Sequence, residues 1–323
     1  MTKGLTSIIV PSRSPEFLQK TVDDLLLKAE GNIEIIIVLD GIWPEKYNWS
    51  DKRIRVIHQG TIHNSLGMRA AINTGVALAE GEYLLKCDEH TLWDKGYDKK
   101  LIVESQDNTM QVPRRYRLDA DNWKIVEDGR DPVDYMYLEY PYLKPYDKTQ
   151  GLHGNWDKQR YYDRKDILID DLMTMQGSCY FLPRKLWDSV IVEMDNKNYH
   201  SFTAEAQELS NKIWLSGNRV VVNKNTWIAH LHKGGRGRRY GFSNEQYRKH
   251  EEGMERGRLY CIDFWVNNKW DKRVHDFEWL IEKFWPVPGW PEDWKTRIHT
   301  DKKLDYSTLK YKDDPWLSGL RTE

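Results

Sequence analysis

The sequence predicts an α/β fold, in which a mostly parallel, Rossmann-like sheet is flanked by helices and followed by a helical C-terminal extension. Two observations lead to this prediction. Short apolar runs alternate with segments of helical periodicity through residues 1–100, a pattern typical of strands joined by crossover helices. The segments that connect them are short, as in such crossover units.

End signals mark each element of the first half. The first strand stops at Pro11, the second at Asp40-Gly41 and the fourth at Asp88, while Gly81 closes the second helix. The expected strands are residues 6–10, 34–39, 53–57 and 82–87, and the expected helices are residues 14–28 and 66–79.

The second half is less regular. Residues 111–165 are rich in Tyr, Asp, Arg and Pro with weak periodicity, so we expect loops and short strands there. We expect two halves of one domain, residues 1–100 and 101–240, followed by a helical, Trp-rich extension at residues 241–323. Further strands are expected at residues 175–182, 219–222 and 226–229, and helices at 184–192, 204–216, 244–258 and 276–284.

Composition narrows the class of protein. No apolar run approaches the ~20 residues of a membrane span, and the N-terminus lacks the pattern of a secretory signal. The three cysteines lie far apart without CxxC spacing, which favours buried thiols in a reducing compartment. We therefore expect a cytoplasmic protein (host cytoplasm if viral) with no membrane partner. No feature of the sequence indicates an oligomeric state.

Acidic residues and a histidine follow two of the predicted strands. Ligands of such sheets bind outside the carboxyl ends of the strands, so Asp40 and Asp88 are expected at one crevice. Asp88 and His90 are two positions apart in an extended turn and point to the same side. Together they could bind a divalent cation that offsets phosphate charge. The alternative is a surface Asp and His at a strand end.

The order of these motifs resembles the nucleotide-binding half of family-2 glycosyltransferases with the GT-A fold. The resemblance rests on Pro11, Asp40-Gly41, the segment Gly67-Met68-Arg69 and the motif Asp88-Glu89-His90. The Asp-x-His form, in place of the commoner Asp-x-Asp, resembles the polypeptide N-acetylgalactosaminyltransferases.

The resemblance continues to about residue 240. Residues 176–181 look like the strand beneath the acceptor site, and residues 205–210 look like the family's acidic helix. Trp227-Ile228-Ala229-His230 matches a strand whose last histidine is a metal ligand. One departure is Phe202-Thr203-Ala204, where those enzymes carry a tryptophan and two glycines on a moving loop.

The resemblance implies a metal-dependent glycosyltransferase that moves a sugar from a nucleotide-sugar, a UDP-sugar being favoured, to an acceptor hydroxyl. Asp88, His90 and His230 would hold Mn²⁺ (or Mg²⁺) against the diphosphate. Without the Asp-x-His motif, His230 would be read as a buried structural histidine. His232 is the weaker candidate.

The resemblance also implies donor-binding roles for residues at matching positions. Asp40 would hydrogen-bond the base or ribose, and Arg69 would face the diphosphate unless it is an ordinary helix-surface arginine. The glycine-rich basic segment 233–240 could close over the diphosphate, contact a nucleic-acid backbone or simply be solvated. The expected donor-binding residues are Pro11, Asp40, Arg69, Asp88, Lys233 and Arg236.

Two carboxylates are the catalytic candidates. Glu205 and Glu208 are three positions apart and share a helix face. One of them could deprotonate the acceptor hydroxyl or bind sugar hydroxyls; Glu205 is preferred and Glu208 is the alternative. A solvated helix is the non-functional interpretation.

More than one class of acceptor fits the sequence. Arginine- and tyrosine-rich stretches, PRRYR and KQRYYDRK, could grip DNA that bears hydroxymethylated pyrimidines, as in viral genomes. The same surface could hold a glycan or a peptide. A different class is a non-catalytic sugar- or nucleic-acid-binding module on this scaffold. A nucleotidyltransferase is less favoured, because PSRSPEF after the first strand has no glycine.

Overall fold

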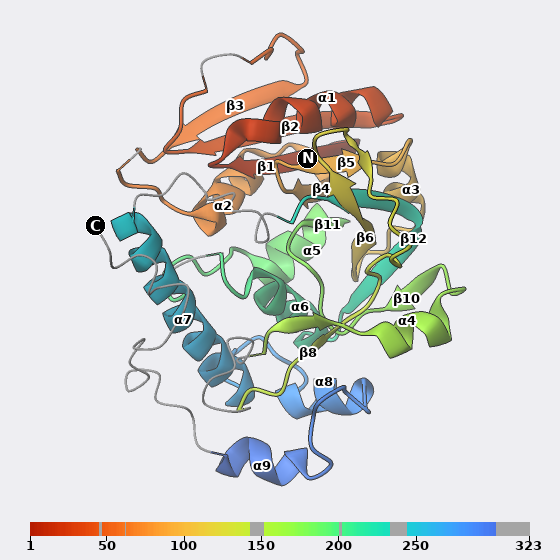
Figure 1. The fold of residues 1–323 in the computed structure, drawn as a ribbon, viewed down its shortest axis with the longest axis vertical. Helices are drawn as coiled ribbons and strands as arrows, with labels where there is room; N and C mark the ends of the chain where they lie inside the picture. The colour runs from red at the N-terminus through yellow and green to blue at the C-terminus, as the bar shows by residue number, and fades with distance from the viewer. Residues whose placement is uncertain (45–46, 62, 143–151, 200–201, 233–243, 302–323) are drawn as a thin grey trace.

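The computed structural model describes residues 1–44, 47–61, 63–142, 152–199, 202–232 and 244–301 (Figure 1). Within these segments, one large sheet has the strand order β10-β12-β6-β11-β4-β1-β2-β3, with β5 added to β12 and β7 to β6. The strands of this sheet are β1 (Thr2–Ser12), β2 (Asn32–Asp40), β3 (Ile54–Gln59), β4 (Gly81–Cys87), β5 (Thr91–Trp93), β6 (Thr109–Asp119), β7 (Lys124–Ile125), β10 (Ile169–Asp171), β11 (Cys179–Pro183) and β12 (Arg219–His230).

Helices cover this sheet, and a separate small ladder joins β8 (Met136–Leu138) to β9 (Gly154–Trp156). The helices are α1 (Leu18–Lys28), α2 (Met68–Leu78), α3 (Tyr97–Val103), α4 (Lys158–Arg164), α5 (Arg184–Leu186), α6 (Glu205–Leu215), α7 (Asn244–Val266), α8 (Phe277–Lys283) and α9 (Trp294–Thr300). Among the described residues, none of these helices is long and apolar enough to cross a bilayer.

The sheet is mostly parallel, as predicted. Strands β3, β2, β1 and β4 run in one direction. Strand β11 is antiparallel to both of its neighbours, β4 and β6, so β6 and its parallel partner β12 point the same way as β1. The carboxyl ends of all these parallel strands therefore meet at one edge.

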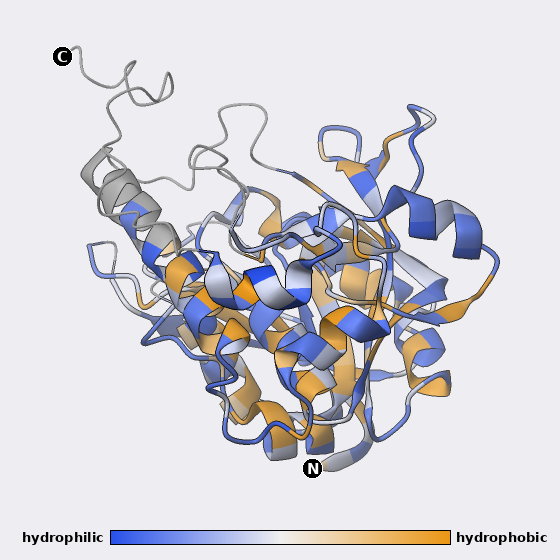
Figure 2. Cartoon of the chain, turned by 90° about the horizontal axis from the view of Figure 1, so that it is seen from below, coloured by the Kyte–Doolittle hydropathy of each residue, from blue (hydrophilic) through white to orange (hydrophobic). Residues whose placement is uncertain are grey.

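The central strands are buried on both faces, which explains their uninterrupted apolar sequences. Ile8 and Ile35 pack with Leu18 of α1 in one cluster. Their neighbours turn to the opposite face, where Ile36 packs with Ala71 of α2. Figure 2 shows hydrophobic residues gathered along the central strands and the helices that pack on them.

The middle of the chain differs from the prediction. The expectation of loops and short strands in residues 111–165 is wrong for β6, which is eleven residues long and lies inside the sheet. Pro113 and the arginines of this strand hide its periodicity. The two short strands expected at 219–222 and 226–229 are one strand, β12, with an irregularity between Asn223 and Trp227.

The described part of the C-terminal extension shares the main core. Trp265, Phe277 and Trp294 belong to the same buried cluster as Ile213 and Trp214 of α6. Helices α8 and α9 lie at the end of the molecule far from β3 and α1 (Figure 1). The many tryptophans of this region are therefore used largely in packing.

Candidate functional site

A cleft of about 900 Å³ opens at the edge where the parallel strands end. Pro11, Asp40, Asp88 and His230 reach it from the ends of β1, β2, β4 and β12. Glu205 lines it from the first residue of α6. Helix α7 contributes Met254 and Arg258, so the C-terminal extension forms one wall of the cleft.

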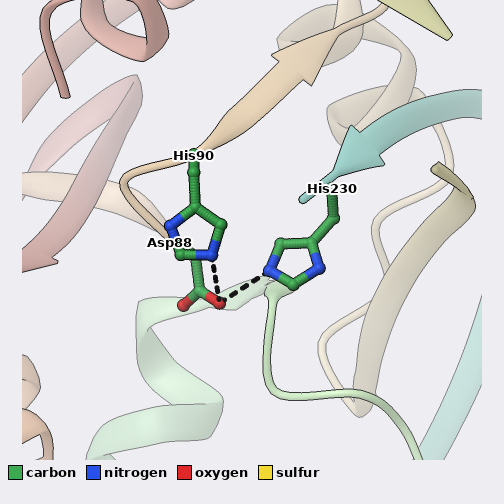
Figure 3. Close-up of side chains that lie close together, drawn as sticks. All are labelled: Asp88, His90 and His230. Carbon is green, nitrogen blue, oxygen red and sulfur yellow. Dashed lines mark hydrogen bonds and ion pairs between the residues drawn. The ribbon is translucent and has the colours of Figure 1, made fainter. Parts of the chain in front are cut away.

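Three of the predicted ligands meet in this cleft (Figure 3). His230 Nε2 lies 3.1 Å from Asp88 Oδ2, and His90 Nε2 lies 3.9 Å from the same oxygen. One ligand atom from each residue lies within 4.8 Å of the others. Residues far apart in the sequence meet because β5 pairs with the end of β12, placing Thr91 opposite His230.

The protonation states of this triad suit a cation. Burial would raise the pKa of Asp88, but the charge of Lys86 and the hydrogen bond with His230 outweigh it and lower that pKa. Burial lowers the pKa of His230, against the opposing effect of Asp88. The group therefore offers an ionised carboxylate and an unprotonated imidazole, the forms that bind metals. This nitrogen and oxygen donor set fits Mn²⁺ or a similar divalent ion.

Lys86 is a site residue that the sequence interpretation missed. Its buried ammonium lies 2.7 Å from Asp88 Oδ1 and 3.2 Å from Glu205 Oε1, and donates to the carbonyl of Gly177 at 2.5 Å. A lysine inside an apolar strand, two positions before Asp88 on the same face, was the available signal. Burial raises the pKa of Glu205, while Lys86 opposes that rise.

Glu208 and Arg69, both predicted as site residues, contact each other. They form a fully buried ion pair outside the cleft lining, and Glu208 also accepts from Lys212 at 2.8 Å. Arg69 donates to the carbonyl of Thr203 at 2.7 Å and stacks 4.1 Å over the ring of Tyr199. This pair joins α2 to α6. The expected contacts of Arg69 with a diphosphate and of Glu208 with a sugar stay predictions.

Asp40 reaches the cleft, but its carboxylate is occupied. Oδ2 accepts from Ser65 Oγ at 2.5 Å and from the amide of Gly67 at 2.8 Å, while Oδ1 accepts from the amide of Leu66 at 2.8 Å. Asp40 therefore holds the loop before α2 at the edge of the cleft. Lys233 and Arg236 lie outside the described residues.

Arg115 belongs to the stretch PRRYR that the sequence assigned to a possible acceptor surface, and the structure places it in the same cleft as Asp88. It lines the cleft from β6 with an exposed fraction of 6%. Burial lowers its pKa to about 9, partly offset by Asp88, so the guanidinium is protonated at neutral pH. Its neighbours in that stretch, Arg114 and Arg117, instead form ion pairs with Asp134 and Asp128.

The fold is α/β, and Asp88, His90 and His230 at the strand ends form a group that could hold a metal ion. The comparisons identify the family. The model for glycosyl transferase family 2 matches residues 7–168. Glycosyltransferase GlyG of Streptococcus pneumoniae is 30% identical over 241 residues, covering 69% of this chain and 70% of that protein. The chain therefore belongs to glycosyl transferase family 2 and is by family a glycosyltransferase.

Two further comparisons agree. The uncharacterized glycosyltransferase EpsJ of Bacillus subtilis is 35% identical over 115 residues, which span 33% of this chain and 32% of EpsJ. A crystal structure of GalNAc-T7 with UDP, GalNAc and Mn²⁺ superposes with a TM-score of 0.59 at 14% identity, covering 87% of this chain and 56% of that one. At this identity the match shows the fold alone, and it confirms the predicted GT-A architecture.

Proposed function

We propose that this protein transfers a sugar from a nucleotide-sugar, most simply a UDP-sugar, to an acceptor hydroxyl in a metal-dependent reaction. The observation that carries the proposal is the convergence of Asp88, His90 and His230 with Glu205 in one cleft. A binding module would have no need for a cation triad beside a buried carboxylate. Family membership independently supports the transferase interpretation.

Asp88, His90 and His230 are the residues that would hold the cation, with Mn²⁺ favoured over Mg²⁺ because two of the donors are imidazoles. When bound, the cation offsets the negative charge of the departing nucleoside diphosphate. The GalNAc-T7 crystal structure named above contains Mn²⁺ with UDP, which supports the same pairing here.

Glu205 is the proposed carboxylate at the reacting hydroxyls. It lies in the cleft lining, and Lys86 fixes one side of it, so it can accept a hydrogen bond from a sugar or acceptor hydroxyl. Pro11 and the loop held by Asp40 form the end of the cleft proposed for the nucleoside. Lys233 and Arg236 stay predictions as donor ligands.

The acceptor is proposed to be a glycan or peptide hydroxyl. The basic stretches expected to grip DNA are largely engaged internally: Arg114 pairs with Asp134 at 2.6 Å, and Arg164 with Asp170 at 2.5 Å. Arg117 pairs with Asp128. Paired arginines have less charge to offer a phosphate backbone. DNA with hydroxymethylated pyrimidines is therefore retained only as a test substrate.

A cytoplasmic location is also proposed. Cys87 and Cys179 face each other across the β4–β11 ladder, yet both are free thiols, as is the buried Cys261. Free buried thiols are typical of a reducing compartment.

The test is nucleotide release from a panel of nucleotide-sugars with Mn²⁺, with oligosaccharides, peptides or hydroxymethylcytosine DNA as acceptors. We expect cleavage of one donor, accelerated by a glycan or peptide and not by DNA. Acceleration by DNA alone would contradict the proposed acceptor. No release from any donor, with sugar or nucleotide binding retained, would contradict the transferase and favour a binding module.

A further inference from the structure

Arg115 is a buried cation in the cleft lining, and one nitrogen of its guanidinium has no hydrogen-bond partner among the described residues. This nitrogen is Nη1, and it is buried. In that same part of the chain, Arg115 also forms no ion pair, whereas its neighbours Arg114 and Arg117 pair with Asp134 and Asp128. A buried charge that Asp88 offsets only in part is costly, so its retention points to a ligand that completes it.

The position of Arg115 indicates which ligand this is. On β6 it lies opposite Ile228 of β12, two residues before the level of His230. Its charge interacts electrostatically with Asp88, His230 and His232. The guanidinium therefore stands beside the cation triad, on the wall formed by β6 and β12.

The buried cation beneath Asp88 and Glu205 is already committed. Lys86 is shared between Asp88 and Glu205 at 2.7 and 3.2 Å and donates to the carbonyl of Gly177. Arg115, which lines the cleft together with Arg13 and Arg258, is the buried arginine among the three and can receive an anion that enters the cleft. A planar guanidinium can donate two parallel hydrogen bonds to phosphate oxygens, which an ammonium cannot do.

We infer that Arg115 binds the diphosphate of the nucleotide-sugar directly and gives the cleft an affinity for phosphate that does not require the metal. This inference rests on the proposed function, because it takes the donor to be a nucleoside diphosphate. It adds a phosphate ligand from β6, a strand that supplies no member of the cation triad.

The experiment measures binding of inorganic pyrophosphate, UDP and uridine in EDTA by calorimetry. Wild type is expected to bind pyrophosphate and UDP, and Arg115→Gln to weaken both by about tenfold or more while uridine binding is unchanged. Arg115→Lys should restore part of the loss. Arg130→Gln is the matched control, because Arg130 is 67% exposed and pairs with Asp128 away from the cleft lining.

Two results would overturn the inference: wild type that binds no pyrophosphate in EDTA, or Arg115→Gln that binds it as tightly as wild type. The first needs no variant, so the inference is testable even if Arg115→Gln folds poorly. Pyrophosphate binding that depends on Arg115, without cleavage of any nucleotide-sugar in Mn²⁺, would support this inference and contradict the proposed function. If a nucleotide-sugar is cleaved in Mn²⁺ but wild type and Arg115→Gln bind pyrophosphate equally well, this inference is contradicted and the proposed function is not.

Discussion

Lys86 lies behind the cleft lining and forms a buried ion pair with the cleft residue Glu205, with Nζ 3.2 Å from Oε1. The same ammonium lies 2.7 Å from Asp88, so one lysine links the carboxylate of the cation triad to the carboxylate proposed at the reacting hydroxyls. Both side chains of the pair are almost fully buried. Removing the lysine would leave two anions in the cleft floor with reduced compensation.

Replacing Lys86 with Met is therefore expected to reduce both stability and transfer. The free energy of unfolding should fall by about 3–5 kcal/mol, the range for breaking a buried charge pair, as measured by urea denaturation. Lys95→Met is the control, because Lys95 is 83% exposed and should change stability little. Equal stability of the two variants would show that Lys86 does not compensate the carboxylates.

Replacing His230 and replacing His232 should have different effects on Mn²⁺ affinity. His230→Ala is expected to weaken Mn²⁺ binding by more than about tenfold, because it removes a proposed ligand that contacts Asp88. His232→Ala should leave the affinity nearly unchanged, since His232 is outside the group of three whose ligand atoms converge. Titration of Mn²⁺ followed by electron paramagnetic resonance measures both. A larger effect from His232 would contradict the assignment.

The Arg69–Glu208 pair should act on stability. Arg69→Met and Glu208→Gln are each expected to cost about 3–5 kcal/mol, because each leaves the other charge buried. The double variant should cost clearly less than the sum of the two, since it removes both charges. Urea denaturation of wild type, the two single variants and the double variant gives the coupling free energy between Arg69 and Glu208. Additive losses, or a main effect on nucleotide affinity in a stably folded variant, would contradict the structural role.

Gly177 should tolerate no side chain if Glu205 is to keep its place. A Cβ at Gly177 would lie 2.5 Å from Glu205 Oε2, so the carboxylate must move. Gly177→Ala is expected to lower kcat/KM by at least about tenfold, equivalent to about 1.4 kcal/mol of transition-state stabilisation. The melting temperature should fall as well, because the displaced carboxylate is the buried partner of Lys86. Unchanged kinetics would place Glu205 outside the reaction.

The sequence was sufficient for the fold and for the triad. Strand ends marked by Pro11, Asp40 and Asp88 place these residues at one sheet edge by the geometry of parallel strands alone. His230 required the family resemblance, because its approach to Asp88 depends on the β5–β12 pairing.

The surroundings of Glu208, Lys86 and Arg115 depend on tertiary packing. Glu205 and Glu208 share a helix face by spacing, but only the packing of α6 against α2 shows that Glu208 turns to Arg69 and away from the cleft. Lys86 and Arg115 gain their roles from neighbours more than 80 positions away or on other strands. A single sequence does not reveal such distant partners.

The most direct test of the central claim is release of nucleotide from the cleaved donor in Mn²⁺, in EDTA and after Mn²⁺ is restored, for wild type and Asp88→Asn. Circular dichroism confirms that both proteins are folded. We expect EDTA to reduce release by at least about tenfold, restored Mn²⁺ to recover it, and Asp88→Asn to stay low in every condition. Release that is equal with and without metal, or unchanged in Asp88→Asn, would contradict a metal-dependent glycosyltransferase centred on Asp88, His90 and His230.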